Sequence, residues 1–342
     1  MSLGTTWTPP ARPKTLLAGL LALVGGVAVA MLCGPDGLGL PEPDLLTLRA
    51  SRVALAVVVG AALSATGAAL QGLLRNPLAD PFVLGVSGGA AMGGAIAVAV
   101  AVAVAAGASA HTGVITGGAV MGALVASALL VAFVRLHAED SDDHRHDVGS
   151  GGSAILVGVV VNAFSWAVVA TVRTMLPAFD AAGLSVWLIG SLHYPEPMAL
   201  IIAAVCSVVG IAILVACGPG LSLLQGGDDD ARRLGVDVHR LRSVVLVTAS
   251  VLTGVAVATT GVIGFVGLLV PHAVRRLGAA HHDGSTILLS AVGGGGLLAG
   301  LDGLARGAFV VVGSELPVGA LCALVGAPIL ALVLVIEARR RS

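Results

Sequence analysis

The chain has 342 residues, of which 57% are hydrophobic and only 11% are charged. Because an ordinary soluble domain carries about 25% charged residues, this composition excludes a soluble globular enzyme. Basic and acidic residues nearly cancel, at 18 against 19, so the chain lacks the basic surface typical of nucleic-acid binding. The mean hydropathy of +1.01 exceeds what one core can bury, and we expect the surplus to face lipid.

Glycine is unusually frequent, with 48 residues and no G-X-Y period. Helices in a membrane associate where small residues let their backbones approach closely. Several apolar segments place glycines four residues apart, such as Gly89 and Gly93, or Gly118 and Gly122. The sequence therefore predicts an all-α integral membrane protein with a tightly packed bundle.

Ten segments approach the roughly 20 apolar residues that a membrane-spanning helix needs, within one transmembrane domain over residues 1–342. Glycines and Pro271 interrupt the apolar run in its seventh and eighth segments, and we expect a turn at 260–264. No A-x-A cleavage site follows the first segment, so we expect it to be retained. The predicted spans are 15–33, 53–72, 85–106, 113–135, 154–172, 198–217, 243–262, 263–277, 286–305 and 318–337.

The few charges predict the orientation of the bundle. Ten spans put both termini on one side, and with the termini inside, most of the 18 basic residues fall in inner segments. Lys and Arg accumulate on the cytoplasmic side of membrane proteins, so we expect both termini to be cytoplasmic. Four basic residues are left outside: Arg49, Arg52, Arg173 and Arg306.

The predicted cytoplasmic segment between the second and third spans, Gln71 to Pro81, is polar and contains Asn76-Pro77 and Asp80-Pro81. Proline removes a backbone donor and restricts the residue before it. These dipeptides therefore predict a fixed non-helical connection, which could also be an ordinary interhelical turn.

A second cytoplasmic segment, 218–242, contains a short helix pattern between Gly227 and Gly235. Three aspartates open it and two arginines close it, which complements the helix dipole at both ends. One interpretation is a solvated connector. The other is a rigid projecting helix on which a soluble partner acts.

Arg49 and Arg52 stand just ahead of the second span, three residues apart and so on one helix face. With Arg306, at the end of the ninth span, they are either snorkelling anchors or a cationic docking patch for an acidic partner. Charges within the spans are otherwise nearly absent, with Asp302 as the exception. That scarcity argues against an ion-coupled secondary transporter, which needs ionisable groups at membrane depth.

The loop at 137–148 is acidic and rich in histidine, but its spacing forms no tetrahedral ligand set, so we expect a solvated loop and no metal site. The motifs H-E-x-x-H and G-x-S-x-G are missing. A phosphate-binding P-loop is excluded because the single lysine, Lys14, follows a proline. We therefore expect that the chain is not itself an enzyme.

Motifs along nearly the whole chain resemble the FecCD family, the permeases of type II ATP-binding-cassette (ABC) importers for iron-siderophores, haem and vitamin B12. The resemblance implies a bundle like that of the vitamin B12 importer permease. The matching segments are Arg49 to Arg52, Gln71 to Pro81, Leu84 to Val86, Gly227 to Gly235, Gly261 to His272, Glu315 to Gly319 and Gly326 to Pro328.

The resemblance also implies partners: a second permease copy, a periplasmic or lipoprotein binding protein, and two ATPases that hold ATP and Mg²⁺, with no cofactor on this chain. It places the protein in the inner membrane. It assigns binding-protein docking to Arg49, Arg52 and Arg306, and a loosely matched cytoplasmic gate to Ser150 and Ser153. The ATPase-coupling residues by motif position are Gly227, Asp228, Ala231, Arg232, Arg233, Leu234 and Gly235, and those of the structural loop are Arg75, Asn76, Pro77, Asp80 and Pro81.

The function implied is import of a bulky metal chelate by ATP-driven alternating access. An iron-siderophore is the first candidate for the substrate, and vitamin B12 and haem are the alternatives. A secondary transporter is the rival of another class.

Overall fold

The computed structural model describes residues 13–34, 37–40, 42–104, 108–139, 149–278 and 284–341. Within these ranges the regular elements are helices joined by connections, apart from a small antiparallel ribbon, β1 (Cys33–Gly34) with β2 (Gly37–Leu38), in which Cys33 pairs with Leu38. The helices are α1 (Pro13–Leu32), α2 (Pro43–Leu73), α3 (Val86–Ala103), α4 (Ala108–Glu139), α5 (Gly149–Met175), α6 (Ala178–Leu188), α7 (Pro197–Leu224), α8 (Asp228–Arg233), α9 (Val238–Thr260), α10 (Val266–Arg276), α11 (Gly284–Gly307), α12 (Phe309–Val312) and α13 (Val318–Arg341).

Each of the ten predicted spans falls on a helix, which confirms the all-α membrane fold. In the described part of the chain, seven helices are long and apolar enough to cross a membrane, and α4, α6 and α13 contribute shorter apolar stretches. The predicted turn near 260–264 is the break between α9 and α10.

The predicted eighth span is incomplete. Helix α10 has 11 residues, which at 1.5 Å per residue cover about 16 Å, half the hydrocarbon thickness. Its entry, 261–265, is non-helical and largely buried, with Ser191 N–H donating to the Thr260 carbonyl at 2.9 Å. Irregular backbone is tolerated at membrane depth when protein surrounds it. A half-length helix preceded by a buried non-helical segment is therefore compatible with a position inside the membrane.

Two short helices, α6 and α12, have no counterpart among the predicted spans. Helix α6 follows Pro177 and has 11 residues, too few to register as a span. The Trp187 indole near its end donates to the Ala258 carbonyl of α9 at 3.4 Å. Helix α6 therefore packs beside the broken end of α9.

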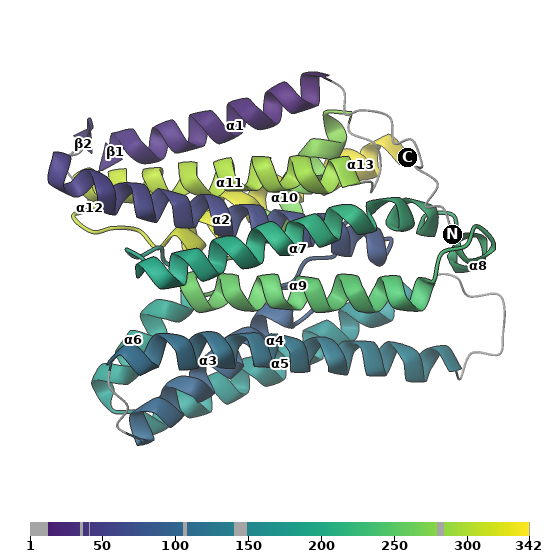
Figure 1. The fold of residues 1–342 in the computed structure, drawn as a ribbon, viewed down its shortest axis with the longest axis horizontal. Helices are drawn as coiled ribbons and strands as arrows, with labels where there is room; N and C mark the ends of the chain where they lie inside the picture. Colours follow the sequence, from purple (N-terminus) through teal and green to yellow (C-terminus); the bar gives the residue numbers. More distant parts are fainter. Residues whose placement is uncertain are drawn as a thin grey trace.

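The long helices lie side by side along the long axis of the molecule (Figure 1). Helices α1, α2 and α11 form one group, α3, α4 and α5 another, and α7 and α9 run between them. Helix α8 lies at the same end as the start of α1 and the end of α13, whereas α12 and the ribbon lie at the opposite end. We call these the α8 end and the arginine end.

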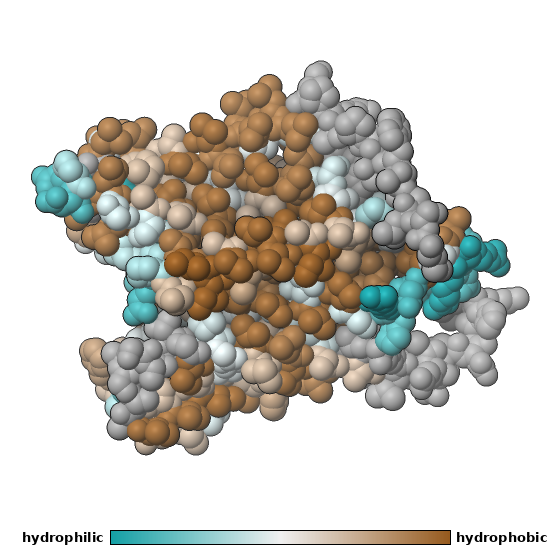
Figure 2. Space-filling model, viewed as in Figure 1, coloured by the Kyte–Doolittle hydropathy of each residue, from teal (hydrophilic) through white to brown (hydrophobic). Residues whose placement is uncertain are grey.

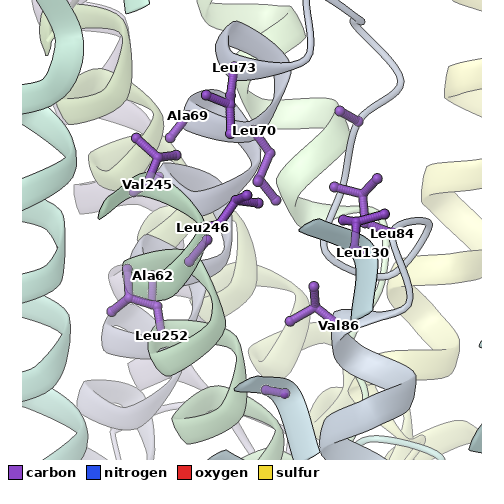
Figure 3. Packing of buried hydrophobic residues seen from close by; sticks show 14 of the residues in the cluster. Ala62, Ala69, Leu70, Leu73, Leu84, Val86, Leu130, Val245, Leu246 and Leu252 are labelled. Carbon is purple, nitrogen blue, oxygen red and sulfur yellow. The ribbon is translucent and has the colours of Figure 1, made fainter. Parts of the chain in front are cut away.

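Small residues bring the helices together as the glycine spacing predicts. A Cβ on Gly93 of α3 would overlap the Gly118 carbonyl of α4, and one on Gly67 of α2 would overlap the Gly267 carbonyl of α10. Larger side chains fill the space between α2 and α9, where Leu70 lies close to Leu246 (Figure 3). The bundle is thus held by backbone contact as well as by side-chain packing.

On the face shown in Figure 2, the middle of the bundle is apolar and polar residues gather in patches near the two ends. Large hydrophobic side chains are exposed on the long helices, including Leu21 of α1, Leu156 of α5 and Val208 of α7. A soluble monomer rarely exposes so continuous an apolar surface. The distribution fits a protein that crosses a membrane several times.

Candidate functional site

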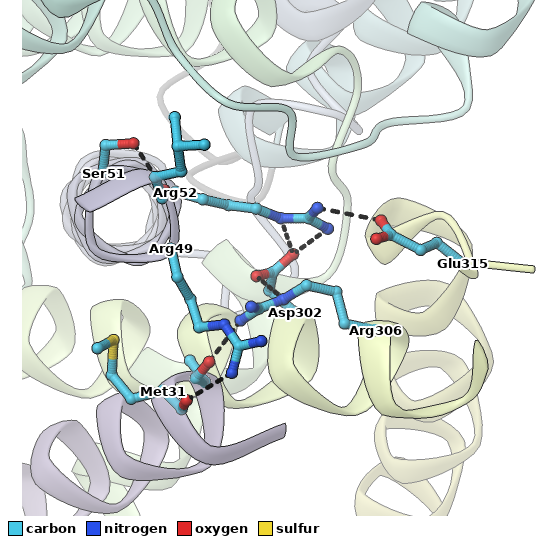
Figure 4. Close-up of polar contacts among 9 residues, drawn as sticks. Met31, Arg49, Ser51, Arg52, Asp302, Arg306 and Glu315 are labelled. Atoms are coloured by element: carbon cyan, nitrogen blue, oxygen red, sulfur yellow. Dashed lines mark hydrogen bonds and ion pairs between the residues drawn. The ribbon is translucent and has the colours of Figure 1, made fainter. Parts of the chain in front are cut away.

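Charged side chains gather at each end of the bundle. At the arginine end, Arg49 and Arg52 project from the first turns of α2, and Asp302 and Arg306 from the last turns of α11. Glu315 comes from the connection between α12 and α13. Figure 4 shows these five side chains converging, and we call them the arginine cluster.

Arg52 is the centre of the arginine cluster. Its Nε and Nη2 donate to Oδ1 of Asp302 at 3.1 and 2.9 Å, and its Nη1 donates to Oε2 of Glu315 at 3.0 Å. The guanidinium carbon also lies 5.7 Å from the centre of the Tyr194 ring, within the range of a cation–π contact. Every nitrogen of this guanidinium therefore has a partner within the protein.

Arg306 shares the other oxygen of Asp302. Its Nε lies 3.1 Å from Oδ2, an ion-pair distance without hydrogen-bond alignment, and its Nη2 donates to the Ala30 carbonyl at 2.6 Å. The Nη1 of Arg49 donates to the carbonyls of Met31 at 2.9 Å and Gly39 at 3.4 Å. Two of the arginines thus tie α11 and α2 to the end of α1.

All three arginines are buried: Arg49 is 8% exposed, Arg52 5% and Arg306 1%. Sequence analysis left them either as snorkelling anchors or as a cationic docking patch; their burial does not fit snorkelling anchors, and the docking role stays a prediction. The physical reason for the burial is Asp302, whose buried carboxylate draws two guanidiniums inward. Buried charge is retained when it is paired and hydrogen-bonded.

Sequence analysis noticed Asp302 but missed its pairing. One signal was available, because Asp302 and Arg306 are four residues apart on one helix and so share a face. The contacts of Arg52 span 250 residues to Asp302 and 263 to Glu315. The local sequence pattern does not predict these two long-range contacts.

At the α8 end, the predicted projecting helix is present. Gly227 precedes it with φ of 113° and Gly235 follows it with φ of 88°, values that glycine adopts without strain. Ala231 is buried, and Leu234 is exposed. The side chains of Arg232 and Arg233 are exposed and pair with Asp229 at 2.9 Å and Asp230 at 3.9 Å.

Asp228 differs from the other aspartates of α8 because it contacts other elements. Arg242, in the first turn of α9, donates Nη2 to Asp228 at 2.8 to 3.0 Å, and Arg75 Nη2 lies 3.8 Å away. Arg232 Nη2, one turn along α8, lies 4.0 Å away. Asp228 therefore joins α8 to the end of α2 and the start of α9.

The predicted structural loop is the non-helical connection between α2 and α3. Asn76 Oδ1 accepts from Leu78 N–H at 2.9 Å and Asp80 Oδ1 accepts from Phe82 N–H at 2.8 Å. Pro77 and Pro81 follow these two residues, and each side chain closes a turn across its proline. The interpretation as a fixed connection fits this geometry.

Asp80 is the buried carboxylate of this connection. Burial raises its pKa from 3.8 to about 6, although the hydrogen bond from Phe82 N–H acts in the opposite direction. Its Oδ2 faces Gly267, the second residue of α10. The connection thus packs against the half-length helix.

Glutamine side chains complete the links around the last turn of α2. Gln71 Nε2 donates to the Gly267 carbonyl at 3.1 Å, and its Oε1 accepts from Arg275 of α10. Gln225, between α7 and α8, donates to the Gly72 carbonyl at 2.9 Å. The end of α2 is therefore joined both to α10 and to the segment that carries α8.

Two sequence predictions cannot be placed. Ser150 and Ser153 belong to the first turns of α5, but their side chains lie outside the described residues, and most of the 137–148 loop does too. Among the residues described, no group of three or more His, Cys, Asp or Glu side chains could hold a metal ion.

Comparison with known proteins gives several relatives over most of the chain. It is 37% identical over 298 residues to a cobalamin import permease of Halobacterium salinarum, covering 86% of this chain and 74% of that one. It is 34% identical over 301 residues to a hemin transport permease of Yersinia pestis, covering 87% and 84%. A solved structure in an inward-facing conformation, assigned to metal-chelate type ABC transporters, matches with a TM-score of 0.77 at 26% identity, covering 94% and 98%.

The sequence profile of the FecCD transport family matches residues 42–336. That range includes both charged ends, the broken α9–α10 segment and all but the first of the long helices. The chain therefore belongs to the FecCD transport family.

Proposed function

We propose that this chain is the membrane-spanning permease subunit of a binding-protein-dependent ABC importer, and that it moves a bulky metal chelate into the cytoplasm. The observation that carries the proposal is a family-matched bundle with a charged short helix between two glycines at one end and an arginine cluster at the other. In this proposal the protein is not itself an enzyme. ATP and Mg²⁺ bind to two separate ATPases.

The α8 end is the proposed ATPase-binding face, and both termini are then cytoplasmic. Helix α8 projects exposed charges and Leu234, while Ala231 and Asp228 anchor it to the bundle. A partner that moves α8 would therefore also move the ends of α2 and α9. Asp228, Arg75 and Gln225 are the contacts through which that motion would pass.

The arginine end is the proposed docking face for a binding protein outside the membrane. The arginine cluster contains three arginines and two carboxylates, of which Arg52 and Arg306 pair with the carboxylates and Arg49 does not, so its five side chains carry a net positive charge. Charge of one sign at a rim steers an acidic partner and fixes its orientation. Arg49 and Arg306 donate to backbone carbonyls at the end of α1, whereas one contact of the buried Arg52 is with Glu315, whose side chain is 42% exposed. We therefore propose that Arg49 and Arg306 position the site and that Arg52 pairs with the partner.

The proposed substrate class is a metal chelate, with an iron-siderophore first and vitamin B12 or haem as alternatives. Relatives named for cobalamin, hemin and Fe(3+)-citrate import support the class without separating its members. We further propose that two copies of the chain enclose the path and alternate between outward-open and inward-open states. The ligand that copurifies with the cognate binding protein would identify the substrate.

A secondary transporter is the less favoured alternative. Such a protein needs an ionisable group that gains and loses a proton or an ion at membrane depth. Asp302, the buried acid noticed in the sequence, is held by two guanidiniums. It is therefore poorly suited to cycle between charge states.

The test is reconstitution in proteoliposomes with the cognate ATPase inside and the binding protein outside. We expect uptake of the binding protein's ligand only when ATP is enclosed and both partners are present. Uptake in the absence of the ATPase, driven by an ion gradient alone, would contradict the proposal. An ATPase Walker-A lysine variant, which assembles but cannot hydrolyse ATP, is the matched control.

A further inference from the structure

The two carboxylates that hold Arg52 differ in exposure. The side chain of Asp302 is 0% exposed and belongs to the packed helix α11. That of Glu315 is 42% exposed and belongs to the non-helical connection before α13. Arg52 therefore has one contact with a buried carboxylate and one with a partly exposed carboxylate.

The two contacts have different energetic consequences. An exposed ion pair contributes little to stability, because water and salt compete for both partners. Removing one partner of a buried pair is costly, because it leaves an uncompensated charge. The Arg52–Glu315 contact can therefore open and close while Asp302 keeps the guanidinium in place.

The geometry of guanidinium makes such an exchange possible. Nε and Nη2 are occupied by Asp302 Oδ1, whereas Nη1 is directed to Glu315. The planar fork of arginine can bind one carboxylate on one edge and another on the next. A different carboxylate could take the position of Glu315 without any change at Asp302.

We propose that Glu315 is an internal occupant of the docking position on Arg52, and that a carboxylate of the binding protein displaces it when the two proteins associate. This inference depends on the proposed docking function of Arg52. Glu315 lowers the affinity for an acidic partner by competing for the same guanidinium nitrogen. It also covers the charge when no partner is bound.

The test measures binding of the cognate, ligand-free binding protein to the intact permease–ATPase complex in nanodiscs at low ionic strength. Removing the competitor with Glu315→Gln should raise affinity by about two- to fivefold, the range expected for loss of one exposed ion pair. Glu315→Asp, which keeps the charge but shortens the side chain, should raise it less.

Glu196→Gln is the matched control. Glu196 is an exposed glutamate that precedes α7, close in sequence to Tyr194, and the described ion pairs of Arg52 are with Asp302 and Glu315. Both substitutions remove one negative charge. If Glu315→Gln gains no more affinity than Glu196→Gln, displacement is refuted and only the net charge matters.

A third substitution separates this inference from the docking function itself. Arg52→Gln should abolish most of the binding, and Arg52→Lys, which keeps a cation beside Asp302, replaces it if the glutamine variant does not fold. Loss of binding in either variant with no gain in Glu315→Gln would leave docking intact and overturn the displacement. Normal binding in the arginine variants would overturn both.

Discussion

The two ends of the bundle use charge in opposite ways. At the arginine end, the charged side chains are mostly buried, and although Arg306 pairs with Asp302 four residues away, Arg52 joins Asp302 and Glu315 across 250 and 263 residues of sequence. At the α8 end, most ion pairs are exposed and join residues three or four apart. Buried ion pairs couple elements strongly and exposed local pairs do not. The helices at the arginine end are therefore held firmly together, whereas α8 is a projecting helix stabilised mainly by its own ion pairs.

Asp228 is the exception that makes the comparison informative. Its contacts with Arg242 and Arg75 connect the projection to two long helices. Without it, α8 would be a locally stabilised helix joined to the bundle mainly by its flanking segments and by buried Ala231. The four predictions that follow test this contrast, beginning with the largest expected effect.

The largest effect should come from Asp302→Ala. This change leaves the guanidiniums of Arg52 and Arg306 buried without their shared carboxylate, at a cost of about 3–5 kcal/mol. Thermal unfolding in detergent should show a large fall in midpoint or loss of folded protein. Glu315→Gln, which removes the partly exposed ion pair with Arg52, should lower the free energy of unfolding by no more than about 1 kcal/mol. Equal losses of stability in the two variants would contradict the contrast between buried and exposed ion pairs.

Gly67→Val should come next, because it separates α2 from α10 between the two ends. A Cβ at this position overlaps the Gly267 carbonyl, and overpacking costs about 1–3 kcal/mol. Thermal unfolding measures the loss, with Gly117→Ala as the control because nothing lies within 4 Å of its added Cβ. A Gly67→Val protein as stable as the control would mean that this backbone contact is dispensable.

Asp80→Asn should have a smaller effect that depends on pH. The folded state raises the pKa of Asp80 to about 6, so it binds the proton more tightly than the unfolded state, and stability falls as pH rises from about 4 to about 6. Asparagine removes this dependence and can still accept from Phe82 N–H. The unfolding midpoint of the variant should therefore match or exceed that of the wild type at pH 7.5.

The same comparison at pH 5 supplies the check. The advantage of Asp80→Asn over the wild type should shrink there, because part of the wild-type carboxylate is protonated. Asp44→Asn, at an exposed acid in the first turn of α2, is the control for removing one carboxylate charge. If the stability advantage of Asp80→Asn over the wild type were larger at pH 5 than at pH 7.5, the predicted direction of the pH dependence would be wrong.

Asp228→Asn should have the smallest effect on stability, below about 1 kcal/mol, because its ion pairs are partly exposed. Its effect on function should be larger. We expect the ATPase to hydrolyse ATP with reduced uptake, since α8 loses its contacts with α2 and α9. Asp229→Asn, which removes a pair made only within α8, is the control, and equal coupling in both variants would count against the Asp228 connection.

Most of the fold could be predicted from the sequence because a membrane span is a local property. About 20 apolar residues suffice to identify one, and the ten segments so identified fall on helices. The half-length of α10 could not be predicted, because it depends on neighbours that bury the backbone at 261–265. Hydropathy does not record which backbone atoms other helices cover.

The same distinction explains the sites. Helix α8 was predictable because its aspartates, arginines and flanking glycines are adjacent in sequence. Of the arginine cluster, the three arginines were singled out from the sequence, but Glu315 and the burial of the set were not. The hydrogen bonds that bury Arg52 join it to Asp302 and Glu315, which are far away in the sequence. Only folding brings these residues together.

Helix α2 is one uninterrupted helix of 31 residues, with Arg52 near its start and Gln71 near its end. At 1.5 Å per residue these two side chains are separated by about 28 Å along the axis. If α2 moves as a rigid rod, a tilt of about 5° about the position of one side chain displaces the other by about 2.5 Å. That displacement approaches the length of a hydrogen bond, enough to make or break the contacts at either end of α2.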